Sequence, residues 1–149
     1  MSFLRERLAA CDEAVRAHLD PGEEVLAVGR CEDVTEHGSL ERGGGWTFVM
    51  VTNTRLRWVP HADLRFESAL ALDDITAVTE RSAGHRYAIA LDHGSLTRAH
   101  HAPAHRFLWF AWGNAIASSA MTRTELAFSR RDTAAAQALR DQASSRELM

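Results

Sequence analysis

The chain has 149 residues, the size of one domain with a core of its own. Its 17 basic residues are all arginine, the net charge is −3, and the longest run of basic residues is Arg130-Arg131. Nucleic-acid-binding faces and membrane-surface segments carry clusters of basic residues. We therefore expect neither nucleic-acid binding nor strong membrane binding.

The N-terminal residues lack the apolar core of a signal peptide, and no apolar run approaches the length of a membrane span. The two cysteines, Cys11 and Cys31, form no CxxC pair and are too few for a disulfide scaffold. These features predict a cytoplasmic protein with reduced thiols.

An amphipathic helix is predicted over residues 2–19, because apolar residues recur there at helical spacing: Leu4, Leu8, Cys11, Val15 and Leu19. Asp20-Pro21-Gly22 ends it, since proline presets a turn and glycine accepts a positive φ. A first strand is expected over residues 24–30. The polar stretch 32–45, which closes with three glycines, is predicted to be a long loop.

Residues 46–59 predict a β-hairpin that turns at Thr52-Asn53-Thr54, because asparagine tolerates the left-handed backbone of tight hairpins. In the return strand the apolar residues alternate with two arginines, Arg55 and Arg57. We expect these arginines and Arg65 to be solvated and paired with acidic neighbours such as Glu67 or Glu80.

Further strands are predicted at residues 66–72, 75–81, 86–92, 96–101 and 125–128, and a closing helix at residues 132–143. Capping of this helix is expected from Ser129 or from Asp132.

Four motifs of the chain resemble those of bacterial pleckstrin-homology-like (PH-like) proteins of the PH/GRAM superfold: Gly22-Glu23-Glu24-Val25-Leu26, Thr52-Asn53-Thr54-Arg55-Leu56, Leu72-Asp73-Asp74-Ile75 and Phe128-Ser129-Arg130-Arg131-Asp132. The resemblance covers about residues 22–92 and 124–143. It implies an α+β, mainly β fold: a small barrel of about seven antiparallel strands with an N-terminal helix and a C-terminal capping helix.

We expect one PH-like domain over residues 1–149, with helix 2–19, a barrel over residues 23–129 that carries an insertion at 93–123, and helix 132–143. Eukaryotic lipid-binding PH domains are similar in shape but carry a basic cluster near the first hairpin. The corresponding stretch here, residues 32–42, is net acidic and would repel an inositol phosphate.

The insertion contains a group of histidines, His100, His101 and His105, of the kind that could bind Zn²⁺. The spacing fits no helical metal motif, and adjacent residues of a strand point to opposite faces. A polar histidine-rich loop is the simpler interpretation, so no resident metal is expected.

The segment 107–112 carries four aromatic residues, Phe107, Trp109, Phe110 and Trp112, and has no polar residue to offer to solvent. It is either buried on both sides or exposed as an aromatic patch. In the second case it would serve as a contact surface, most simply for a second copy of the chain.

The sequence has no nucleophile with a matching base and no phosphate-binding loop, and Asp73-Asp74 fits a turn better than a pair of catalytic carboxylates. We expect no catalytic residues and no cofactor. The first hypothesis is a non-enzymatic PH-like interaction module that self-associates and binds a protein partner through strand edges, the acidic loop and the segment 107–112, with Phe107, Trp109 and Trp112. The alternative is a small-ligand or metal-binding barrel that uses the His/Trp-rich insertion 93–112, with His100, His101 and His105 as donors and the tryptophans as walls.

If the aromatic segment is an interface, Trp109→Ala or Trp112→Ala will lower the molar mass of the protein in solution, because large aromatic side chains dominate interface energetics. Size-exclusion chromatography with light scattering measures this mass. A wild-type chain that elutes as a clean monomer would contradict self-association.

Overall fold

The computed structural model describes residues 2–36, 39–40, 46–83, 86–94, 97–100, 122–129 and 133–149. Their elements, in chain order, are α1 (Ser2–Arg16), β1 (Val25–Glu36), β2 (Ser39–Leu40), β3 (Thr47–Thr52), β4 (Arg55–Pro60), β5 (Phe66–Ala71), a 3₁₀ turn (Leu72–Asp74), β6 (Ile75–Ala83), β7 (Arg86–His93), β8 (Thr97–His100), β9 (Thr122–Ser129) and α3 (Ala134–Ser145).

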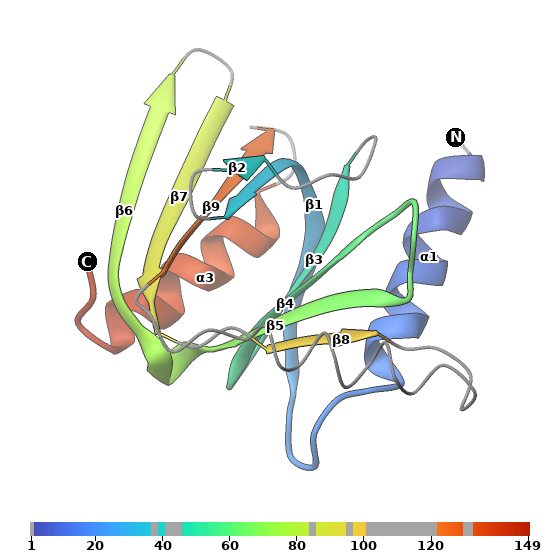
Figure 1. Cartoon of the computed structure of the whole chain (residues 1–149), viewed down its shortest axis with the longest axis horizontal. Coiled ribbons are helices and arrows are strands. Elements are labelled where there is room, and N and C mark those ends of the chain that lie inside the picture. Colours follow the sequence, from blue (N-terminus) through green and yellow to red (C-terminus); the bar gives the residue numbers. More distant parts are fainter. Residues whose placement is uncertain are drawn as a thin grey trace.

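The strands form one antiparallel sheet in the order β6-β7-β9-β1-β3-β4-β5-β8, with the short β2 paired to β1 (Figure 1). The long strand β1 joins the two parts of the sheet. Its first half pairs with β3 and its second half with β9, and Cys31 lies opposite a residue of each. A strand that changes partners along its length allows the sheet to curl, so the seven longer strands of the described chain form a half-barrel.

The inner face of the curled sheet holds the larger core. Its buried side chains come from both parts of the sheet, with Val51, Trp58 and Leu126 among them, and α3 adds Ala135 and Leu139. Alternation along each strand directs these residues inward, and α3 covers them because its apolar residues recur at helical spacing.

A second, smaller core lies on the outer face of β3 and β4, under α1. Cys11 and Val15 of the helix pack there with Phe48, Met50 and Val59 of the sheet. In Figure 1, α1 and α3 accordingly lie on opposite sides of this part of the sheet. Strand β3 is buried on both faces, so all six of its residues are buried.

The predicted mainly-β architecture with a helix at each end is confirmed. The N-terminal helix ends at Arg16 rather than at residue 19, and the C-terminal helix spans Ala134–Ser145 rather than residues 132–143. The strand expected at residues 96–101 is present as β8, inside the predicted insertion.

The prediction of a long loop over residues 32–45 was wrong for its first part. Strand β1 continues to Glu36, because β9 pairs with it from Cys31 onward, and Ser39–Leu40 form β2. One apolar residue in this polar stretch, Val34, points into the core and is 1% exposed. The partner strand lies some ninety residues further along the chain, so local sequence does not reveal the pairing.

Candidate functional site

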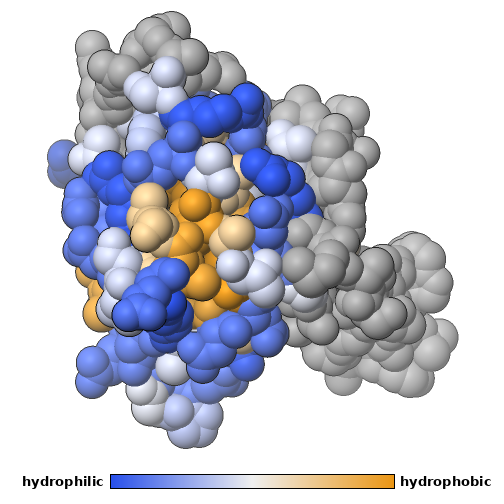
Figure 2. Space-filling view, turned by 90° about the vertical axis from the view of Figure 1, so that its left-hand side faces the viewer, coloured by the Kyte–Doolittle hydropathy of each residue, from blue (hydrophilic) through white to orange (hydrophobic). Residues whose placement is uncertain are grey.

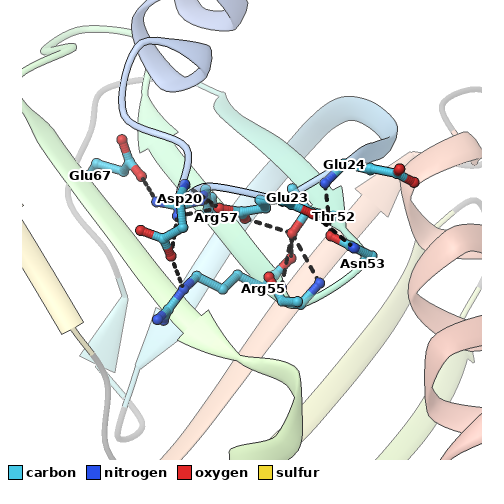
Figure 3. A network of polar contacts seen from close by, with 10 residues as sticks. Asp20, Glu23, Glu24, Thr52, Asn53, Arg55, Arg57 and Glu67 are labelled. Atoms are coloured by element: carbon cyan, nitrogen blue, oxygen red, sulfur yellow. Dashed lines mark hydrogen bonds and ion pairs between the residues drawn. The ribbon is translucent and has the colours of Figure 1, made fainter.

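A network of charged side chains lies where the connection between α1 and β1 crosses the β3–β4 hairpin (Figure 3). Its centre is Arg57 on β4, which is 5% exposed. The Arg57 guanidinium donates from Nε and Nη2 to the Glu23 carboxylate, at 2.9 and 2.7 Å, and from Nη1 to Glu67 Oε2 at 2.7 Å. One buried cation is therefore held between two buried carboxylates.

The register of the sheet brings these groups together. Arg57 lies opposite Met50 of β3 and Ala69 of β5, so it points to the outer face of the sheet. Glu67 precedes Ala69 by two residues on β5 and shares that face. Glu23 comes from the connection after α1, the same connection that supplies the more exposed Asp20 as a partner of Arg55 at 2.9 Å.

The hairpin turn completes the network through three hydrogen bonds of Thr52 and Asn53. Thr52 Oγ1 donates to Glu23 Oε2 at 2.6 Å and accepts the backbone N–H of Arg55 at 2.9 Å. Asn53 Oδ1 accepts the backbone N–H of Glu24 at 2.8 Å. The Gly-Glu-Glu and Thr-Asn-Thr-Arg motifs, which lie thirty residues apart in sequence, thus contact each other in space.

The network changes the acidity of its own members. Burial alone would raise the pKa of the Glu23 carboxyl, but hydrogen bonds from Arg57, Thr52 and the backbone of Asp20 outweigh it and lower that pKa to about 2. Burial would likewise lower the pKa of Arg57, yet the bonds to Glu23 and Glu67 raise it. Glu23 and Arg57 therefore stay ionised, and their ion pair holds the connection after α1 against β4.

The expectation that the hairpin arginines are solvated was wrong for Arg57. Its predicted partner Glu67 is confirmed, but the pair is buried because the α1–β1 connection covers it. Glu80 instead lies near Arg140, at 3.7 Å, and Arg65 pairs with Asp63 at 2.9 Å. The signal for burial was β3, whose apolar residues occupy both faces and therefore require a cover on the outer one.

Next to Glu67, at the start of β5, Phe66 is an exposed aromatic residue on the strand that pairs with β8, the last strand of the described order. Its side chain is 47% exposed, and the Arg65 guanidinium carbon lies 5.8 Å from its ring centroid. The backbone of Phe66 pairs with His100 of β8. Phe66 and its charged neighbours Arg65 and Asp63 define the surface that we call the β5–β8 edge.

The predicted site residues are placed only in part. His100 is the last residue of β8 and lies in register with Phe66. His101, His105, Phe107, Trp109 and Trp112 lie outside the described residues. Phe66 was not predicted as a site residue. The sequence offers one signal for it: Phe66 is an apolar residue at the first position of a predicted strand, directly after a charged turn.

His93, which sequence places near the histidine group, lies inside the barrel instead. It is fully buried, and its Nε2 lies 2.8 Å from Thr124 Oγ1. Across the ranges that the structure describes, no three His, Cys, Asp or Glu residues are grouped so as to hold a metal ion. Within the same ranges, no helix combines the length and apolar character needed to cross a membrane.

Comparison with known proteins finds no matching family model and no matching curated protein. Among solved structures, the Vps36 N-terminal PH domain is similar to this chain, with a TM-score of 0.49 and 16% sequence identity over 85% of this chain and 86% of that chain.

Replacing Arg57 by methionine will destabilise the protein by about 3–5 kcal/mol, because Glu23 and Glu67 would remain buried without a cation. Arg55→Met is the matched control on the same strand. It should lower the free energy of unfolding by only about 0–1 kcal/mol, since Asp20, the partner of Arg55, is exposed. Urea unfolding measures both values. Equal losses for the two variants would contradict the assigned role of Arg57.

The low pKa of Glu23 also predicts a pH dependence of stability. Because this pKa is lowered from 4.5 to about 2 on folding, the contribution of Glu23 is complete above pH 4.5 and is lost as the pH falls toward 2. In urea unfolding across this window, wild type should lose more stability than Glu23→Gln. Parallel pH profiles for the two proteins would show that Glu23 is not the group responsible.

Proposed function

We propose that the protein is a non-enzymatic interaction module that self-associates and binds a protein partner through the β5–β8 edge. The observation that carries the proposal is Phe66, a large aromatic side chain that is 47% exposed beside an edge strand. Aromatic residues are enriched at interfaces, where their burial supplies much of the binding energy.

The surroundings of Phe66 suit an interface better than a free surface. The Arg65–Asp63 pair beside it supplies the polar rim that interfaces place around an apolar centre. Among the strands that the structure describes, β8 has four residues and ends the strand order, and the backbone groups on the outer side of a last strand can pair with another chain.

The residues predicted from sequence extend the same proposal. His100 lies in register with Phe66, and the chain continues from it directly to His101 and His105 and then to the aromatic segment 107–112. We propose that these residues belong to the same contact surface. The cytoplasmic location and the lack of strong membrane binding remain predictions from composition.

Phe66→Ala will weaken self-association about 30-fold or more, the effect of removing an aromatic hot spot worth about 2 kcal/mol. Phe3→Ala is the matched control, because Phe3 is 76% exposed but belongs to α1 and not to β5 or β8. Sedimentation equilibrium measures the association constant of each variant.

Two results would contradict the proposal: a wild-type chain that stays monomeric at all concentrations, or equal association constants for the Phe66 and Phe3 variants. The urea unfolding midpoints of both variants serve as the folding control, since an exposed side chain contributes little to stability.

A further inference from the structure

The opposite edge of the sheet, formed by β6, is covered at one point by the end of the chain. The backbone N–H of Val78 donates to the carbonyl oxygen of Leu148 at 3.3 Å. Residues of an antiparallel strand direct their backbone groups alternately to either side, so this N–H points away from β7. The C-terminal segment, which we define as Arg146–Met149, thus stands where a neighbouring strand would pair.

The turn that brings the C-terminal segment to β6 is a Schellman motif at the end of α3. Leu148 N–H donates to the carbonyl of Ala143 at 2.9 Å, and Glu147 N–H donates to Ser144 at 3.0 Å. Glu147 has φ +59°, the left-handed conformation that glycine usually supplies at this position. Because Glu147 has a side chain, the turn that holds the C-terminal segment against β6 is less stable than it would be with glycine at this position.

Few contacts hold the C-terminal segment in place. Leu148 packs, partly buried, against the larger core, as does Val78. Arg146 Nε bonds Asp73 Oδ1 at 3.0 Å, but Asp73 is 88% exposed, so this ion pair adds little. Met149 is 52% exposed. The segment can therefore leave β6 without disturbing the strands beneath it.

The surface next to this edge suits an extended, partly apolar peptide. The face of the molecule on which β6, β7 and the C-terminus lie shows an apolar area surrounded by hydrophilic residues (Figure 2). Strand β6 continues past Val78 to Ala83. On that stretch Glu80 accepts a hydrogen bond from Tyr87 and faces Arg140, whose guanidinium carbon lies 5.2 Å from the Tyr87 ring centroid.

We propose that the β6 edge is a docking site for an extended segment of a partner protein, which pairs with Val78 and places an apolar side chain where Leu148 now lies. Strand addition of this kind takes its affinity from main-chain hydrogen bonds and its selectivity from side-chain positions. The C-terminal segment competes for the same edge and must leave before the partner binds. This site is distinct from the β5–β8 edge and shares with the proposed function only that the partner is a protein.

The test uses the chain shortened by Leu148 and Met149, with a synthetic peptide of the sequence Ser145–Leu148 as the probe. Nuclear magnetic resonance titration, which detects weak binding, should show saturable shifts at the Val78 amide and its neighbours on β6. A peptide with serine in place of the leucine should shift them at least tenfold less, and the full-length chain should respond at least tenfold less to the original peptide. Absence of shifts, or equal shifts with both peptides, would overturn the proposal.

Two full-length variants test the competition even if the shortened chain does not fold. Glu147→Gly should slow hydrogen exchange of the Val78 amide about fivefold to thirtyfold, because glycine accepts the left-handed conformation at no cost. Leu148→Ser should speed it. If neither variant changes the exchange rate of the Val78 amide, the C-terminal segment does not cover this edge of the sheet. Because the readout is confined to β6, its failure is separate from a failure of Phe66→Ala to weaken self-association.

Discussion

The pairing of the buried Arg57 guanidinium with Glu23 and Glu67 is the constraint on which the arrangement of the first half of the chain depends. It joins the connection after α1, the strand β4 and the strand β5. A charge in a protein interior needs a partner, so any fold that separated these three segments would leave one buried and unpaired. The network therefore fixes the connection after α1 against β4 and β5.

The sheet itself is the middle layer of the molecule. One core lies between its inner face and α3, and a second between its outer face and α1. Over the residues that the structure describes, the strand order of the curled sheet ends at β6 on one side and at β8 on the other. Unpaired strand edges invite pairing with another chain. The two proposed contact surfaces are these two ends, one beside Phe66 and the other under Leu148.

Local patterns account for what could be predicted. The hairpin around Asn53, the alternation of β6 and β7 and the apolar stripe of α1 are all visible within a few residues of sequence, because they reflect the periods of strand and helix. The continuation of β1 through Glu36 was missed because its pairing partner is β9. Polar residues on the outer face of this half of β1 look like a loop until the partner strand is known.

The candidate sites, like the fold, were predictable where they depend on neighbouring residues and not where they depend on contacts between distant segments. The Thr52-to-Arg55 motif was recognised from sequence, but its contact with Glu23 and the burial of Arg57 depend on a crossing of segments that are distant in the chain. Phe66 was overlooked for a similar reason. Its exposure follows from the position of β5 near the end of the sheet, which no local pattern indicates.

By itself, the sequence determined the fold class, the hairpin, the two helices and the acidic, lysine-free surface chemistry, because these depend on composition and on residue spacing along short stretches. Only the tertiary structure decided which face of each strand is covered, which charges are buried and which backbone edges remain at the ends of the sheet. Burial and edge position are properties of where distant segments meet. For that reason Arg57, Phe66 and Leu148 acquire their roles only in the folded chain.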